Sequence, residues 1–529
     1  MTTIIIDPVS RIEGHLRVEL NVDDTTHTVT SSKCVGCLYR GFENIVLNRD
    51  PRDAAPILSA ICGVCHSDHH IASVRALENA AGLTQYVNNY AAEKTSLPKN
   101  AVLARNVVVG ADWTYSHAAH ILALAGPDYH LYNLLDVLKQ SVVVNSYADL
   151  LKWIIIPAQA YMHQIITLWG GKAPHQRGTI PGGNPVRPTA EVIAETKARI
   201  ANFRTTLDIA APVIWNYLTA NALTLAGLGP GNGNFIAMGV FPDPTTSAGT
   251  DKMPHVFPSG VILSPKTTPD SFDPTQITED VSYSYYDQPS SSPLIGEQSP
   301  APDMSKAGAY TWGKTPLYQG KMCESGPLSR QYVSGIYPAL GQAIHSINSA
   351  VPGLPLNPKG SVFDRMTARA VELVALIGSN NTTKNLQVLE QPLNLSLVDV
   401  LTALNLPTNG LMETWLDAMD VGQPSYVSTY KNPSSGEGIG LLEAPRGSLI
   451  HWIKINNSKT QDYQVIAPTT WNVCPNGPLE KGLVGTPVGT AGTDEDLRQA
   501  AYVIRSFDLC LACTVHTVDA LGNERYLKV

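Results

Sequence analysis

Two Cys-x-x-Cys pairs, each followed by a histidine, lie near the two ends of the chain. One pair is in ICGVCHSDH (61–69) and the other is in CLACTVH (510–516). Thiolates are soft ligands that favour nickel, zinc, copper(I) and iron, and four of them can enclose one ion or bridge two. The pattern therefore predicts a metal site whose ligands are Cys62, Cys65, Cys510 and Cys513. Taken by itself, either pair also fits a structural zinc site.

A third pair, Cys34 and Cys37, lacks a histidine at ligand spacing, so a structural zinc knuckle or a chance spacing accounts for it. The rest of the sequence argues against zinc at the first two pairs. Arginine and glutamate recur in short, distinctive motifs, namely RIEGH, RGFE, DPRDA and EAPRG. A structural zinc site needs none of these side chains, whereas a guanidinium near four thiolates would offset their negative charge and act on a small substrate.

The composition is that of a globular chain with a slight excess of acidic residues. Of its 529 residues, 43% are hydrophobic and 16% are charged, and the formal net charge is −8. This balance, without a basic run, argues against nucleic acid as a partner. The N-terminal stretch lacks the pattern of a secretory signal, and the longest uncharged stretch (209–241) is too polar to span a bilayer. We therefore expect a protein that is cytoplasmic, or that reaches a membrane only through partners.

The elements that must position the cysteines are mostly helical. Alternation of apolar and polar residues indicates strands over 1–50, and clustered Pro, Ser, Thr, Asp and Gly indicate irregular peripheral structure with short strands over 241–310. Helical spacing of apolar residues predicts long helices over 66–82, 99–126, 131–169, 189–223, 331–350 and 362–380. We expect a predominantly helical α+β fold, formed as a single body (1–529). Its parts are a β-rich segment (1–60), a bundle of long helices as core (61–230), the irregular segment (241–330), and helices with a β-rich return that carry the second cysteine pair (331–529).

Eight blocks, in order along the chain, carry a resemblance to one family. They are PVSRIEGHLRVE (8–19), YRGFENIV with RDPRDA (39–54), ICGVCHSDH (61–69), GGKAPH (170–175), YTWGKTPLYQGKMCESGPLSR (310–330), EAPRGSLIHW (443–452), APTTWN (467–472) and CLACTVH (510–516). With them the chain resembles the large, catalytic subunit of nickel–iron hydrogenases, in a divergent uptake-type branch. The resemblance implies the fold of those subunits and the reversible heterolytic cleavage of H2 to protons and electrons, in the direction of uptake.

The resemblance also implies which cysteines hold which metal. Cys62 and Cys510 would bind nickel terminally, while Cys65 and Cys513 would bridge nickel to an iron that carries carbon monoxide and cyanide. Thiolate sulfur suits this role because it has lone pairs to share between two soft metals.

Further site residues follow from the same blocks. Arg446 would lie over the metals and polarise or deprotonate bound hydrogen, with Cys510 as the competing base, and Asp508 would partner this arginine. Glu13 corresponds to the carboxylate by which protons leave. Two residues would line the diatomic ligands, Pro445 and Thr469. Without the resemblance, a surface arginine and a turn threonine are the simpler interpretations.

A second metal position, for magnesium or iron, is implied at Glu43, the carbonyl of Val465, and His516; a surface glutamate and a capping histidine are the simpler alternatives. His69 would support a thiolate without binding nickel. Three other histidines have weaker claims to chemistry: His117 and His120 share a helix face and fit satisfied core positions, and His175 lies in a block that would face a small subunit.

The chain departs from the family pattern at Ala60, where arginine is frequent, at Ser116, where many members have an aspartate facing the arginine, and at Leu509, where proline is usual. In the family a peptidase usually removes residues that follow the last histidine. Here these are residues 517–529, and we expect this branch to retain them.

Electrons from H2 require a route that this chain lacks. The remaining cysteines are too few and too scattered for a relay of iron–sulfur clusters; they are Cys34, Cys37, Cys323 and Cys474. An iron–sulfur small subunit is therefore the expected obligate partner, in a heterodimer or a larger assembly. The alternatives are an H2-sensing regulatory hydrogenase, a quinone-reaction subunit of the same ancestry, which lacks the nickel cysteines, and a non-catalytic zinc scaffold.

Overall fold

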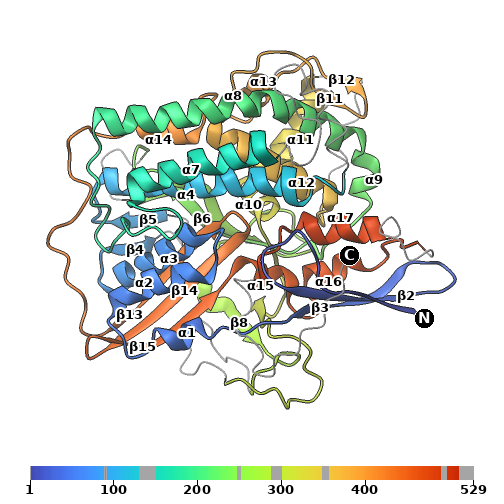
Figure 1. Ribbon diagram of the computed structural model, residues 1–529, viewed down its shortest axis with the longest axis horizontal. Coiled ribbons are helices and arrows are strands. Elements are labelled where there is room, and N and C mark those ends of the chain that lie inside the picture. The colour runs from blue at the N-terminus through green and yellow to red at the C-terminus, as the bar shows by residue number, and fades with distance from the viewer. Residues whose placement is uncertain are drawn as a thin grey trace.

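The computed structural model combines helices and strands (Figure 1), and Glu13, near one end of the chain, pairs with Cys510, near the other. It describes residues 2–87, 90, 92–129, 151–246, 252–287, 301–347, 357–489 and 497–511. The helices are α1 (Phe42–Ile45), α2 (Ala54–Leu58), α3 (His66–Ala80), α4 (Lys99–Ala119), α7 (Ile156–Gly170), α8 (Ala190–Ala220), α9 (Ala222–Ala226), α10 (Pro327–Ser334), α11 (Ile336–Ile347), α12 (Val362–Ile377), α13 (Leu397–Ala403), α14 (Leu411–Asp417), α15 (Pro468–Val473), α16 (Pro478–Leu483) and α17 (Arg498–Ser506). The strands are β1 (Thr2–Ile6), β2 (Leu16–Val22), β3 (Val29–Gly36), β4 (Thr84–Val87), β5 (Ala92–Thr95), β6 (Phe235–Pro242), β7 (Lys252–Ile262), β8 (Ile277–Asp280), β9 (Thr315–Tyr318), β10 (Glu324–Ser325), β11 (Gln387–Val388), β12 (Gln391–Pro392), β13 (Gly436–Ala444), β14 (Gly447–Asn456) and β15 (Lys459–Ile466).

Four long helices, α4, α7, α8 and α12, pack into a bundle, in which α4 contacts α7 and α12, and α8 contacts the same two (Figure 1). Local signals fix where they begin: the Thr189 side chain accepts a hydrogen bond from the Val192 N–H before α8, and Ser361 does the same for the Asp364 N–H before α12. Part of the predicted helix over 131–169 lies outside the described residues. Within the described ranges, no helix has both the length and the apolar character needed to cross a bilayer.

Helix α3 packs closely on the antiparallel sheet β13-β14-β15. The approach requires glycine on β13, because a Cβ added at Gly440 would lie 1.9 Å from the carbonyl oxygen of Ala72 in α3. This contact fixes the start of α3, which directly follows Cys65, relative to the turn between β13 and β14, which carries Arg446. The glycine spacing in the β-rich return is therefore part of what positions the site.

Strands β1, β2 and β3 form the predicted N-terminal sheet, and the alternating burial along β2 matches its alternating sequence. Two other expectations are wrong. The segment 241–330 contains β7, an 11-residue strand paired along a fully buried β6, and prolines at 254 and 258 disguise its strand pattern. The single helix expected over 331–350 is two helices, because Gly335 adopts a φ of 78° between α10 and α11.

Candidate metal centre

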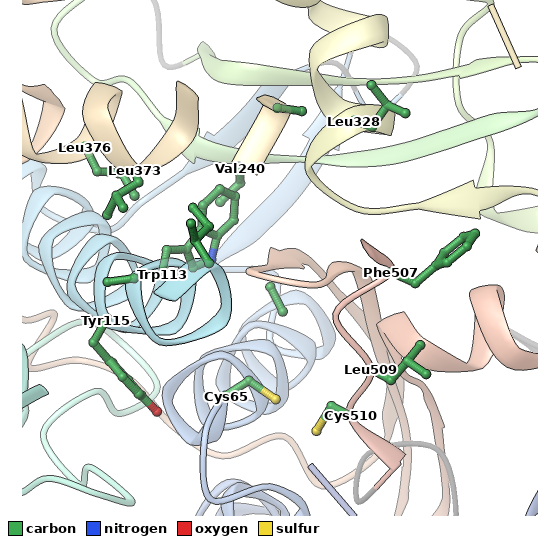
Figure 2. Packing of buried hydrophobic residues seen from close by; sticks show 14 of the residues in the cluster. Cys65, Trp113, Tyr115, Val240, Leu328, Leu373, Leu376, Phe507, Leu509 and Cys510 are labelled. Atoms are coloured by element: carbon green, nitrogen blue, oxygen red, sulfur yellow. The ribbon is translucent and has the colours of Figure 1, made fainter. Parts of the chain in front are cut away.

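Three cysteine sulfurs from opposite ends of the chain meet in the interior. The Sγ atoms of Cys62, Cys65 and Cys510 all lie within 4.8 Å of one another, and all three residues are buried. Those of Cys62 and Cys510 are 3.2 Å apart although the residues are 448 positions apart in sequence. Figure 2 shows Cys65, at the start of α3, beside Cys510. A buried set of soft sulfur donors at this spacing fits a thiolate-preferring transition metal. Cys513, the fourth predicted ligand, lies outside the described residues.

A short parallel bridge between Glu13 and Cys510 holds the two ends of the chain together. The Glu13 N–H donates to the Leu509 carbonyl at 3.2 Å, and the Leu511 N–H donates to the Glu13 carbonyl at 2.7 Å. The hydroxyl of Thr469, at the start of α15, accepts a hydrogen bond from the Cys510 N–H at 3.0 Å. Leucine in place of the usual proline at 509 is therefore compatible with a fixed backbone around Cys510.

The Glu13 side chain lies half-buried beside this bridge. Burial is the largest cause that raises the pKa of its carboxyl; the negative charge of Cys62 raises it further, and the positive charge of Arg446 opposes both. A carboxyl in such surroundings can bind and release a proton closer to neutral pH than an exposed glutamate can.

Arg446 is buried in the turn between β13 and β14 and faces Asp508. Its Nε lies 3.1 Å from Asp508 Oδ1, and Nε of Arg369 in α12 lies 3.5 Å from Asp508 Oδ2. The ring of His120 is 4.0 Å from the same carboxylate. Burial alone would raise the pKa of Asp508, but the two arginines and His120 outweigh it and lower this pKa to about 2. The carboxylate is therefore ionised and fixes the orientation of Arg446.

A second buried arginine, Arg330, braces the turn that carries Arg446. Its guanidinium donates to Glu372 at 3.0 Å and 2.6 Å, to Glu443 at 2.9 Å, and to the carbonyl of Pro445 at 3.1 Å. It also lies 4.0 Å from the centroid of the Trp113 ring, which Figure 2 shows on α4. Pro445 is thus held through its backbone oxygen.

Sequence reasoning assigned no role to Arg330 or Arg369. Arg330 is the last residue of the block 310–330, and this position was the one available sign that it has a role. Arg369 lies in no motif.

His69 belongs to a buried series of hydrogen bonds that connects α3 to β14 and β15. Its Nδ1 is 3.0 Å from Nε2 of His451 in β14, and Nδ1 of His451 is 2.9 Å from the hydroxyl of Tyr463 in β15. Burial lowers the pKa of His69 to about 4, so its ring is neutral near pH 7. These hydrogen bonds fix α3, which follows Cys65, against the sheet β13-β14-β15.

The second predicted metal position contains Glu43 and Val465, while His516 lies outside the described residues. The Val465 N–H, rather than its carbonyl, contacts this carboxylate, donating to Glu43 Oε1 at 2.8 Å. Burial raises the pKa of Glu43, and the positive charge of Lys314 opposes this rise. Lys314 in turn lies 3.2 Å from Glu279. The cluster is rich in oxygen donors, as a hard cation requires, but it already holds one cation.

The other histidine candidates each make one hydrogen bond within the described part of the chain. His117 Nε2 lies 3.1 Å from Glu372 and His120 Nε2 lies 2.7 Å from the Arg505 carbonyl. Both are core histidines, as predicted, but they are only half satisfied, because Nδ1 of each is buried without a hydrogen-bond partner among the described residues. His175 lies 3.0 Å from the Ser59 carbonyl. Of the third Cys-x-x-Cys pair, Cys34 is buried in β3 and Cys37 is exposed. Neither belongs to the cysteine cluster found among the described residues.

Comparison with known proteins places this geometry in context. A family model described as "Nickel-dependent hydrogenase" matches residues 40–141 and 131–516, and one described as "HoxL-like" matches residues 3–30. The chain is 31% identical to the periplasmic [NiFeSe] hydrogenase large subunit of Desulfomicrobium baculatum, over 99% of this chain and 96% of that one. It is 27% identical to the uptake hydrogenase large subunit of Rhizobium leguminosarum bv. viciae, over 98% and 96%. The reduced Ni-Fe-Se hydrogenase structure from D. vulgaris Hildenborough superposes with a TM-score of 0.76 at 29% identity, covering 97% of this chain and 100% of that one.

Proposed function

The chain belongs to the nickel-dependent hydrogenase family, and on that premise we propose that it oxidises H2 as the large subunit of an uptake-type [NiFe] hydrogenase. As a member of this family it is an oxidoreductase that acts on H2. The observation that carries the proposal is the meeting of Cys62, Cys65 and Cys510 within 4.8 Å, beside a buried arginine. The uptake direction is supported by similarity to the R. leguminosarum uptake subunit.

The donor set fits the metals that the family implies. Cys62 and Cys510 would be terminal nickel ligands, and Cys65 and Cys513 would bridge to an iron carrying carbon monoxide and cyanide. Backbone N–H groups of Val64 and Cys65 lie 3.2 Å from the Cys62 sulfur, which supports a thiolate there. When bound, the centre supplies the metals at which H2 is polarised and split.

The chain's own residues manage the proton. Arg446, held by Asp508, presents a buried guanidinium to the site, and either it or Cys510 is the proposed first base. Burial opposes the charged form of Arg446, but Asp508 and the cysteines outweigh it and raise the pKa of Arg446, which favours Cys510 as the base. Glu13 follows, because its backbone pairs with that of Cys510 and its half-buried carboxyl has a raised pKa, through burial first and the negative charge of Cys62 second. Pro445 and Thr469 would line the diatomic ligands of the iron. The Pro445 carbonyl accepts a hydrogen bond from Arg330, and the Thr469 hydroxyl accepts one from the Cys510 N–H. The proton therefore leaves along the N-terminal segment.

A hard cation, magnesium or iron, is proposed at Glu43, with Val465 and His516. The supporting observations are the partly buried carboxylate of Glu43, the buried carboxylate of Glu279, and the amide of Gln464, which donates to Glu279 at 2.6 Å. Such an ion would link β15, through Val465, to the C-terminal segment, through His516.

Electrons are proposed to pass to an iron–sulfur small subunit. Support comes from the small number of spare cysteines, namely Cys34, Cys37, Cys323 and Cys474, none of which belongs to the sulfur cluster found among the described residues. Any membrane contact would be made through partners, and the complex would work in the cytoplasm or at a membrane.

Infrared spectroscopy of the purified complex, together with metal analysis and H2-dependent dye reduction, tests the proposed function. We expect absorption in the carbon monoxide and cyanide stretching region, nickel and iron in the protein, and dye reduction that requires H2. Replacing Cys62 by serine should abolish all three while the chain stays folded. Zinc without nickel, or an empty stretching region in active protein, would refute the assignment.

A further inference from the structure

One face of α4 turns toward the loop that precedes α3. Asp112 Oδ2 accepts a hydrogen bond from the Ser67 N–H at 3.2 Å, and the Tyr115 hydroxyl donates to the Val64 carbonyl at 2.5 Å. Ser116 lies one helical turn after Asp112 and so shares this face. Helix α4 therefore presents Asp112 to the first turn of α3 and Tyr115 to the loop before it, and Ser116 lies on the same face of α4.

Several polar atoms at this contact are buried without a hydrogen-bond partner. Considering the described residues only, this holds for both carboxylate oxygens of Asp68, for Oδ1 of Asp112 and for Oγ of Ser116. Asp68 and Asp112 are 0% exposed, and Ser116 is 1% exposed. Nε2 of His66 is also unpartnered and lies 4.0 Å from Asp112 Oδ1. Buried polar atoms in native proteins almost always bind protein or ordered water, so the cluster requires bound water, a proton, or both.

The two carboxyls share one electrostatic environment. The titratable and charged groups that face them are Cys62, His66, Tyr115, Arg330 and Arg446. Burial raises the pKa of Asp68 well above its usual range, and repulsion from Asp112 adds to this effect. Burial is also the largest cause that raises the pKa of Asp112. Two desolvated carboxyls that repel each other do not both ionise near neutral pH.

We propose that Asp68 and Asp112 hold one proton between them through ordered water and form a second proton acceptor, on the α4 side of the site, in addition to Glu13. The inference deepens the proposed function and rests on it, because the proton comes from H2. Glu13 approaches Cys510 from the N-terminal segment, whereas the Asp68–Asp112 pair lies on α3 and α4. The site would thus have carboxyls on two sides.

The step conserves atoms and charge. Heterolytic cleavage of H2, which is the proposed activity, supplies the proton, and a water molecule passes it to the ionised member of the pair. The water accepts the incoming proton and gives one of its own protons to the carboxylate, so one O–H bond of the water is replaced by another. One O–H bond forms on the carboxylate, and no electron is transferred. The pair then carries two protons until one returns through water, so that it stores a proton without changing its redox state.

Infrared titration of the carboxylic acid C=O band, which shifts in D2O, tests the shared proton directly. In the wild-type complex we expect this band at neutral pH. In Asp68→Asn and in Asp112→Asn the remaining carboxyl has lost its like-charged neighbour, so the midpoint at which the band disappears should fall by about one pH unit or more. In the double variant this band should be absent. Asp270→Asn is the matched control, because Asp270 is exposed and pairs with Lys266 at 2.6 Å; its spectrum should equal that of the wild type.

The pH profile of D2–water exchange tests the role. We expect exchange in each single variant to fall about tenfold above neutral pH, with nickel content and the carbon monoxide and cyanide bands unchanged. Because the replaced oxygens are unpartnered, the variants should unfold no more easily than the wild type, whereas a purely structural pair would lose stability. A wild-type spectrum without the carboxylic acid band, or an unchanged exchange profile in both variants, would overturn the proposal. Loss of the carbon monoxide and cyanide bands in the wild type would instead refute the proposed function, and the proton-accepting role with it.

Discussion

Replacing Asp508 with asparagine should destabilise the chain more than any surface substitution, because this carboxylate is the shared counter-ion of Arg446 and Arg369, at 3.1 Å and 3.5 Å. Its pKa falls from 3.8 to about 2 in the folded protein. A tenfold change in an ionisation constant is about 1.4 kcal/mol, so the ionised form is favoured by roughly 2 to 3 kcal/mol, and removing one member of a buried ion pair typically costs about 3 to 5 kcal/mol. We therefore expect a loss of about 3 kcal/mol in the free energy of unfolding.

Urea unfolding of the metal-free chains near pH 7, followed by tryptophan fluorescence, measures this loss without a contribution from metal binding. A folded-state pKa below the unfolded value means that the stabilisation is complete above about pH 4 and disappears as pH falls toward 2. The difference between wild type and variant should shrink accordingly. As a control, Asp420→Asn removes an exposed pair with Lys99 and should cost less than about 1 kcal/mol. An Asp508 variant within about 1 kcal/mol of the wild type near pH 7 would refute the reasoning.

Three further predictions concern protons and the second ion. Glu13→Gln should lower H2-dependent dye reduction by about 100-fold or more with nickel content unchanged, because the glutamine cannot bind the departing proton; equal activity would remove Glu13 from the route. Glu43→Gln should reduce tightly bound magnesium or iron at the second position by at least half, as elemental analysis would show against unchanged nickel. Burial lowers the pKa of His69 and His117 to about 4 and that of His120 to about 3. Below about pH 6.5 the unfolded chain therefore binds protons at these rings that the folded chain does not bind. The free energy of unfolding should therefore fall as pH drops below about 6.5, by up to about 3 kcal/mol each for His69 and His117 and about 5 kcal/mol for His120. Urea midpoints that stay constant between about pH 7 and pH 5 would contradict this.

The parts of the site that the sequence predicts are those encoded in short local motifs. Cys62, Cys65 and Cys510 sit in Cys-x-x-Cys pairs whose chemistry is readable without a fold, and the structure brings their sulfurs within 4.8 Å. The long helices were also predictable, because apolar spacing and capping residues such as Thr189 act within a few positions of the chain.

Contacts between distant segments were not predictable in the same way. Arg369 reaches Asp508 only because α12 and the C-terminal turn are neighbours in space, and nothing near Arg369 in sequence marks it. The same holds for Asp68 and Asp112, whose importance arises from burial on two facing helices. Val465 illustrates a finer limit, because a sequence cannot specify whether its N–H or its carbonyl faces Glu43.

The pairing of Glu13 with Cys510 has a consequence for the order of events during synthesis. A ribosome must synthesise the chain as far as residue 510 before that residue can reach the N-terminal segment, and closing so large a loop costs conformational entropy that only later contacts recover. The cysteine pocket cannot form on a nascent chain that stops short of residue 510. Any truncated product would therefore expose Cys62 and Cys65 without their counterpart, so the cell receives either a complete pocket or none.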